Sequence, residues 1–217
     1  MRCTVLVLVC VFGLSCRDVQ PVEQAATIEG YQLYGTVTAA NGAPLDSVEV
    51  RLYYIYNVVQ QTPIDTQLVV VTDSTKILDI SVYTSTYRFV RELYFGYRRT
   101  GVIPRFRWDG RDAEGVPVPS GKYFIRYLID TVIVKYSPVV VDGNPTAFTD
   151  ASGRFTIRND SFPIRELFDL YNAENLYIGT YEVLPVIDLE FRKLNLRRTY
   201  RVELTRDRVT PGVFTLS

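Results

Sequence analysis

The stretch that decides the fold runs from Trp108 to Phe124 and reads WDGRDAEGVPVPSGKYF. It begins at the end of one predicted strand, turns at Gly110 and Gly115, continues as an extended link with two prolines, and enters another strand after Gly121. Glycine supplies the positive φ angles of tight turns, and proline fixes an extended backbone. The stretch therefore predicts the edge of a β-sandwich, and it supplies almost none of the groups that an enzyme needs.

Three acidic residues of this stretch, Asp109, Asp112 and Glu114, crowd one turn. They could coordinate Ca²⁺ together with backbone carbonyl groups. Aspartates in turns also accept hydrogen bonds from the N–H groups of their own turn, and Arg111 can neutralise their charge. We therefore expect a structural turn rather than a metal site. The structural turn residues are Asp109, Gly110, Asp112, Gly115, Pro119 and Gly121, with Asp150 and Gly153 in a second turn of the same kind.

The composition favours strands, and the net charge gives the protein no overall electrostatic field. A chain of 217 residues can hold one large or two small domains, and 47% hydrophobic residues suffice for a core. The 16 tyrosines and 11 phenylalanines, against one methionine, favour pleated strands. The 24 basic and 24 acidic residues cancel to a net charge of zero, so we expect no nucleic-acid partner.

From Tyr31 onward the hydrophobic pattern predicts an all-β chain. Residues 31–38 alternate with the two-residue period of a half-buried strand, and residues 48–56 form the next predicted strand. Asn41-Gly42 between them is a strong turn signal. Residues 164–171 could form a short helix or a loop across the end of the sandwich. Further strands are predicted at residues 76–83, 89–93, 123–128, 181–184, 186–191, 199–204 and 213–216.

Two separated segments carry one family resemblance. Residues 35–52, GTVTAANGAPLDSVEVRL, resemble the first hairpin of carboxypeptidase regulatory-like domains, which are transthyretin-like β-sandwiches. The second signature of that family, a Thr-Asp-x-x-Gly-x-Phe turn and strand, resembles residues 148–157, FTDASGRFTI. The number of residues between these two segments is larger than in the family pattern. The resemblance implies a sandwich built from residues 30–61 and 143–217.

The gap contains the Trp108 stretch, which resembles the Ig-like domain of the flagellar hook-capping (FlgD) family. The predicted strands before Trp108 and after Gly121 also fit that pattern, although residues 96–104 are irregular where the family has a short glycine turn. We expect an all-β fold of two β-sandwich domains, with a FlgD-like Ig-like domain at residues 62–142 inserted into the transthyretin-like host. Two sequential sandwiches are the alternative.

The N-terminus predicts a targeting segment. Residues 1–15 have the form of a signal peptide, because a short positive start precedes an apolar run too short to span a bilayer. The border Gly-Leu-Ser-Cys16 resembles a bacterial lipoprotein signal, although the order of its small residues is unusual. We expect Cys16 to be lipidated and residues 16–29 to be a tether of a membrane-anchored lipoprotein of the bacterial cell envelope. A secreted or periplasmic protein is the alternative.

The residue types available exclude most catalytic designs. The chain has no histidine, and all three cysteines lie within the first 16 residues. This excludes Ser-His-Asp and Cys-His arrangements and histidine-based zinc sites. No spacing selects a catalytic pair among carboxylates such as Asp79, Glu92, Asp169 and Glu190. We therefore expect a non-enzymatic protein with no cofactor and no bound metal.

Aromatic residues suggest two kinds of binding function. Trp108, the only tryptophan, should pack in a sandwich, with a carbohydrate-stacking role as the alternative. Tyr54 and Tyr56 share one side of their strand, where they could be exposed or could cover the joint between the domains. We expect a structural, adhesion or assembly module that engages an envelope protein or a glycan through strand edges and loops. The alternative is a carbohydrate-binding accessory lipoprotein that uses these three aromatic residues.

Overall fold

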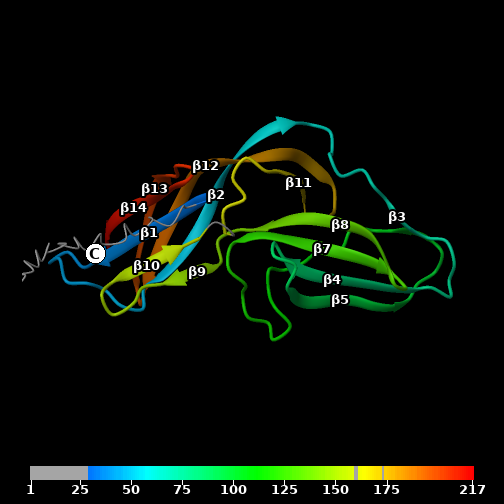
Figure 1. The fold of residues 1–217 in the computed structure, drawn as a ribbon, viewed down its shortest axis with the longest axis horizontal. Coiled ribbons are helices and arrows are strands. Elements are labelled where there is room, and N and C mark those ends of the chain that lie inside the picture. Colours follow the sequence, from blue (N-terminus) through cyan, green and yellow to red (C-terminus); the bar gives the residue numbers. More distant parts are fainter. Residues whose placement is uncertain (1–28, 159–160, 173) are drawn as a thin grey trace, which may run out of the picture.

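The computed structural model describes residues 29–217 except residues 159–160 and 173. This part of the chain is nearly all β, and its packed sheets confirm the predicted all-β sandwich fold (Figure 1). The strands are β1 (Tyr31–Thr38), β2 (Glu49–Gln60), β3 (Val69–Val71), β4 (Ile77–Thr84), β5 (Phe89–Tyr97), β6 (Gly101–Ile103), β7 (Gly121–Ile129), β8 (Val132–Val141), β9 (Pro145–Phe148), β10 (Arg154–Ile157), β11 (Leu167–Tyr171), β12 (Tyr177–Lys193), β13 (Leu196–Glu203) and β14 (Arg208–Thr215).

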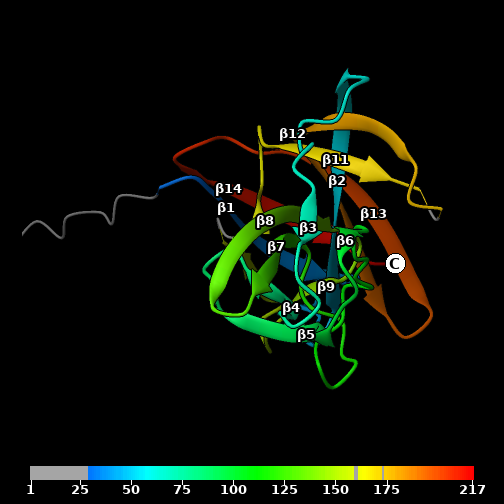
Figure 2. The same ribbon diagram turned by 90° about the vertical axis from the view of Figure 1, so that its right-hand side faces the viewer.

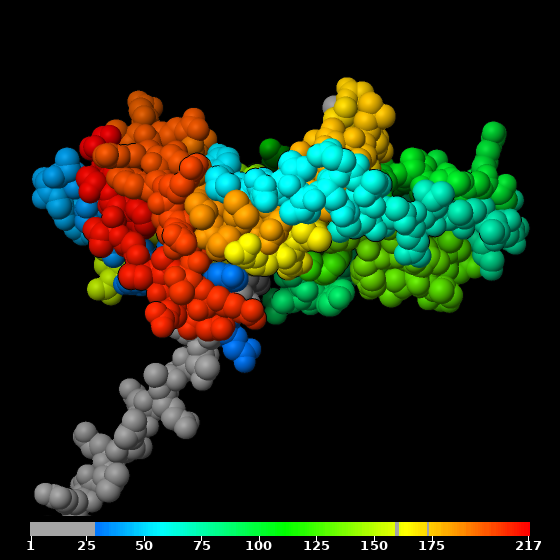
Figure 3. Space-filling model, turned by 90° about the horizontal axis from the view of Figure 1, so that it is seen from above, coloured from blue at the N-terminus to red at the C-terminus, as the bar shows by residue number. Residues whose placement is uncertain are grey.

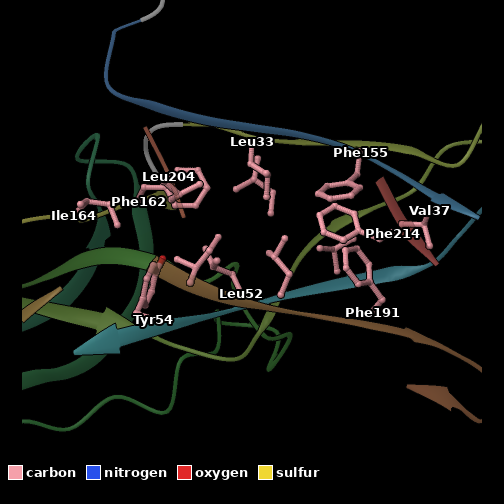
Figure 4. Packing of buried hydrophobic residues seen from close by; sticks show 14 of the residues in the cluster. Leu33, Val37, Leu52, Tyr54, Phe155, Phe162, Ile164, Phe191, Leu204 and Phe214 are labelled. Atoms are coloured by element: carbon pink, nitrogen blue, oxygen red, sulfur yellow. The ribbon is translucent and has the colours of Figure 1, made fainter. Parts of the chain in front are cut away.

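The first sandwich combines the start and the end of the chain. One sheet has the strand order β10-β1-β14, and the facing sheet has the order β11-β12-β2-β9 with β13 beside β12. Leu33 and Phe155 from the first sheet meet Leu52 and Phe191 from the second, and all four are buried (Figure 4). The two-residue period of β1 and β2 places every second side chain in this core.

The second sandwich is built from the middle of the chain. Its larger sheet has the order β5-β4-β7-β8, and β3 pairs with β6. Leu78 and Ile80 from β4 pack with Tyr123 and Ile125 from β7 in a separate buried cluster. The buried members of this cluster all come from residues 69–141, whereas those of the first cluster come from residues 33–54 and 155–216. Each sandwich therefore has its own core.

The expected first hairpin is wrong in its pairing. β1 pairs with β10 and β14, whereas β2 pairs with β12 and β9, so the two strands lie in opposite sheets. The Asn41-Gly42 turn is present, with Gly42 at a φ of 82° and its N–H donating to Ala39 at 2.9 Å. At this turn the chain crosses from one sheet to the other. The two strands then face each other across one core, where both bury alternate apolar side chains.

The two alternatives for residues 164–171, a short helix and a loop, are also wrong for most of the segment. Most of this segment is β11, which pairs antiparallel with β12 and buries Phe168 in the first core. The predicted strands at 181–184 and 186–191 are one strand, β12, with an irregular register between Val183 and Ile187 around Pro185. No helix among the described residues is long and apolar enough to cross a bilayer.

Candidate functional site at the junction of the two sandwiches

The turn after Trp108 is closed by its own aspartate. Asp112 Oδ1 accepts hydrogen bonds from the N–H groups of Glu114 at 3.1 Å and Val116 at 2.8 Å. The Asp112 N–H donates to the carbonyl of Val116 at 2.9 Å, and Gly115 has a φ of 81°. This arrangement occupies the Asp112 carboxylate within the turn.

Trp108 and Asp109 attach this turn to the second sandwich. The Trp108 Nε1–H donates to the Arg111 carbonyl at 2.7 Å, and its ring meets Tyr123 edge-on with 4.9 Å between the centroids. Asp109 accepts the Arg111 N–H at 3.1 Å and forms an ion pair with Arg91 at 3.1 Å. Across the described residues, no group of three or more His, Cys, Asp or Glu side chains is arranged to hold a metal ion.

A second aspartate turn lies between β9 and β10 in the first sandwich. Asp150 Oδ1 accepts the N–H groups of Ser152 and Arg154, each at 2.9 Å. Gly153 has a φ of 74°, and a Cβ atom there would lie 2.5 Å from the Val37 carbonyl oxygen. Glycine is therefore required at this position for both its conformation and the close approach of β1.

Ser120 and Asn144 tie the two sandwiches together. Ser120 is almost fully buried, and its hydroxyl donates to the Leu52 carbonyl of β2 at 3.1 Å. The Asn144 side-chain amide donates to the carbonyls of Gly110 at 3.1 Å and Val118 at 2.9 Å. The Asn144 N–H donates to the Ser120 hydroxyl at 3.1 Å. The Trp108 turn is thus bonded to the segment that leads back into the first sandwich.

Asp142 lies in the same segment, beside the unpaired edge of β2. Its carboxylate accepts the Tyr54 N–H at 3.0 Å, and the Tyr56 hydroxyl donates to it at 3.5 Å. Although part of its residue surface is exposed, burial raises the pKa of Asp142 to about 6 and outweighs the hydrogen bonds from Tyr54 and Gly143. Burial, and then the charge of Asp142, raise the pKa of the Tyr56 hydroxyl well above its usual range.

A cleft of about 630 Å³ opens between the two sandwiches. β11 of the first sandwich forms one wall, and β8 and residues 105–109 of the second form the others. Figure 2 shows the β11–β12 hairpin above the second sandwich, and Figure 3 shows β2 reaching from one sandwich toward the other. The apolar floor consists of Leu93, Ile125, Val139, Val141, Phe168 and Leu170. We call this space the Trp108 cleft, because Trp108 lies in its wall.

Three arginines line the Trp108 cleft, and they differ in how fully they are engaged. Arg105 packs over the Tyr171 ring at 4.3 Å and forms an ion pair with Asp65 at 3.1 Å. Arg91 Nε is buried and has no hydrogen-bond partner among the described residues. Arg107 is exposed, and it donates to the Tyr171 carbonyl at 3.4 Å. Arg107 therefore presents exposed donors to a ligand, whereas the unpaired Arg91 Nε is covered.

Asp65 fixes the segment between β2 and β3 against the second sandwich. It forms an ion pair with the buried Lys135 at 2.9 Å and accepts the Ser137 hydroxyl at 3.1 Å. Burial alone would raise the pKa of Asp65, but Lys135 and Arg105 hold it below its usual range. Asp169 accepts the N–H groups of Ile64 at 3.0 Å and Asp65 at 2.8 Å, so the wall of the cleft is held on both sides.

The tyrosines predicted as a contact surface are placed differently from the expectation. Tyr54 is only 4% exposed and belongs to the first core, so of the two alternatives for it the exposed one is wrong. The side of β2 that carries Val50 and Leu52 faces the core, and Tyr54 continues that side. Tyr56 is half-buried at the joint and packs edge-on against Tyr54 at 6.3 Å. Trp108 lies in the cleft wall, and Cys16 lies outside the described residues.

Sequence reasoning missed the residues that complete the cleft. Arg91, Arg107 and Tyr171 come from β5, the segment before Trp108 and β11, and nothing in their local sequence joins them. In the sequence, the Trp108 motif is the signal that points to this region, and it predicts the turn. It does not predict the cleft, because the cleft forms only where β11 packs against β8.

The raised pKa of Asp142 gives a pH prediction. Its folded-state pKa of about 6 lies above the ordinary value of 3.8, so its contribution to stability is full below about pH 4. That contribution is lost as the pH rises through about 6. We expect Asp142→Asn, which stays uncharged, to remove this fall in the free energy of unfolding between pH 4.5 and 7.5. Urea denaturation at both pH values measures it.

Glu114→Gln is the matched control, because Glu114 is an exposed carboxyl with no ion pair among the residues described. The control should keep the pH dependence of the unchanged protein. An Asp142→Asn variant with that same dependence would contradict the placement of the carboxylate.

Comparisons with protein-family profiles, curated proteins and solved structures gave no match. The resemblances to carboxypeptidase regulatory-like and FlgD-type domains therefore rest on their motifs alone. The function is argued below from the chemistry of the cleft.

Proposed function

We propose that this chain is a non-enzymatic, lipid-anchored cell-envelope protein that acts as a structural, adhesion or assembly binding module. In this proposal the second sandwich is an inserted Ig-like domain, and the partner is held at its junction with the host. The observation that carries the proposal is the Trp108 cleft, with its apolar floor and arginines at one interdomain boundary. Pockets of this size and lining at domain boundaries are typical binding sites.

The fixed walls of the cleft support binding. Ser120 and Asn144 hold the Trp108 turn, and Asp65 and Asp169 hold the segment beside β11. A site that is already ordered loses little conformational entropy when a partner arrives. The cleft thus has the rigidity that a binding module needs.

Two of the four carboxylates considered for catalysis are held in ion pairs, while Asp169 lies in the cleft lining and accepts backbone N–H groups. Asp79 forms an ion pair with Arg126 at 2.9 Å, and the buried Glu190 is paired with Arg192 and Arg197. A glycosidase needs two carboxyl groups facing one another across its substrate. The engagement of these groups in ion pairs favours the non-enzymatic proposal.

The lining defines the chemistry of the partner. An apolar side chain fits the floor, and a carboxylate fits the exposed Arg107, because charge-assisted hydrogen bonds to arginine are the strong ones. We therefore propose a protein partner that inserts a segment with an apolar and an acidic residue. The carbohydrate-binding alternative loses support, since Tyr54 is buried and both Tyr56 and Trp108 are half-buried.

The cleft is tested by a photo-crosslinking amino acid at Leu170, which lies in the floor. In the native envelope we expect a discrete protein adduct, and Arg107→Glu should reduce it roughly tenfold, because a charge-assisted hydrogen bond becomes a repulsion. Arg99→Glu is the matched control, since Arg99 is exposed and outside the cleft. The proposal fails if no adduct forms, or if both variants reduce it equally.

The anchor is tested separately at Cys16. We expect Cys16→Ser to move the protein from the membrane fraction into the soluble fraction, because no acyl chain can be attached to serine in its place. Immunoblotting of the two fractions measures the shift. Retention of the variant in the membrane fraction would count against lipid anchoring and would leave the cleft result unaffected.

A further inference from the structure

A group of aromatic side chains covers the outer face of the second sandwich. Along β7, the side chains of Tyr123, Ile125 and Tyr127 are buried in the core. Phe124 lies between them in the chain, so its side chain points to the opposite side of the sheet. The rings on that outer side come from the β4–β5 hairpin, β7 and β8. We call them the aromatic face, and they are Tyr83, Tyr87, Phe89, Phe124 and Tyr136.

The rings of the aromatic face hold one another in fixed positions. Tyr87 is stacked on Phe124 with 5.5 Å between the centroids and 2° between the planes. Tyr136 meets both rings edge-on, at 5.7 Å and 6.0 Å. Tyr87 is nevertheless 61% exposed and Phe89 58% exposed. Ordered and exposed aromatic rings of this kind mark a contact surface.

Few of the charged groups beside these rings are unpaired, but Arg88, between Tyr87 and Phe89 in the chain, is exposed and has no ion pair among the described residues. The hydroxyls of Tyr83, Tyr87 and Tyr136 make no hydrogen bond to any other described residue. Lys122 lies over Phe124 at 5.0 Å and is paired with Glu166 of the first sandwich. A ligand of the aromatic face therefore meets mainly apolar ring surfaces and free hydroxyls, with few unpaired charges beside them.

A groove of about 710 Å³ continues from the aromatic face to the first sandwich. Tyr87, Phe124 and Lys122 form one side, and Ile164 and Glu166 lie on the other. Its lining again mixes apolar and polar groups. It is separate from the Trp108 cleft, because the two share no lining residue.

We propose that the aromatic face and this groove bind an uncharged polysaccharide chain. A pyranose ring has an apolar face of C–H groups, which fits an aromatic ring, and a rim of hydroxyls, which fits the tyrosine hydroxyls. An anionic lipid surface would need a cluster of unpaired cations, whereas Lys122 is paired with Glu166 and Arg126 with Asp79, which leaves Arg88. The site is independent of the Trp108 cleft and of the protein partner proposed there.

Affinity electrophoresis in native gels tests this proposal. The gels contain hydroxyethyl cellulose, galactomannan or laminarin as neutral polysaccharides, and alginate as an anionic one. We expect at least one neutral polysaccharide to retard the protein and alginate to leave it unretarded. Tyr87→Ala and Tyr136→Ala should each weaken the retardation roughly tenfold, because each removes a stacking ring. Arg107→Glu should leave the retardation unchanged, because Arg107 lies in the other site.

Tyr97→Ala is the matched control, because Tyr97 is 68% exposed at the far end of β5 and lies outside the aromatic face. Circular dichroism checks that every variant keeps its β structure. Absence of retardation by all three neutral polysaccharides would overturn the proposal, as would equal weakening by Tyr97→Ala. Binding to phosphatidylglycerol vesicles that Tyr87→Ala abolishes, without polysaccharide binding, would make the face a membrane contact instead.

Discussion

The hydrogen bonds of Ser120 and Asn144 are the constraint on which the rest of the structure depends. Each sandwich has its own buried cluster, so neither core fixes the position of the other sandwich. Ser120 reaches the Leu52 carbonyl of β2, and Asn144 reaches two carbonyls of the Trp108 turn. Buried polar groups are costly to leave unpaired, so these bonds favour one arrangement of the two sandwiches. The Trp108 motif therefore forms a closed turn and also supplies one side of the hydrogen bonds that join the two sandwiches.

This joint gives the larger sheet of the second sandwich two different surfaces. The inner side of β8 contributes Val139 and Val141 to the Trp108 cleft, while Tyr136 from the same strand lies on the aromatic face. The cleft offers the exposed donors of Arg107, and the aromatic face offers ring surfaces beside the paired Lys122 and Arg126. The two proposals therefore assign chemically different ligands to the two surfaces.

Local patterns predicted much of the fold and little of the site. The two-residue period predicted β1 and β2, and the turn residues at Gly115 and Gly153 have the positive φ angles that such turns need. Pairing was harder, because β1 and β2 bury the same side-chain pattern whether they lie in one sheet or in two facing sheets. Tyr54 was misplaced for a related reason, since alternation gives two sides without saying which one faces the core. The cleft and the aromatic face require contacts between distant segments, which no local pattern contains.

The fixed position of the two sandwiches is tested most directly by a distance between them. Spin labels at Val132→Cys in the second sandwich and Val213→Cys in the first occupy exposed sites, and replacing Cys3, Cys10 and Cys16 with serine leaves no other thiol. Double electron–electron resonance should then give one narrow distance distribution, which broadens when Asn144→Ala removes the bonds to the Trp108 turn. A broad distribution in the protein with Asn144 intact would contradict a fixed joint, and with it the cleft that the joint creates.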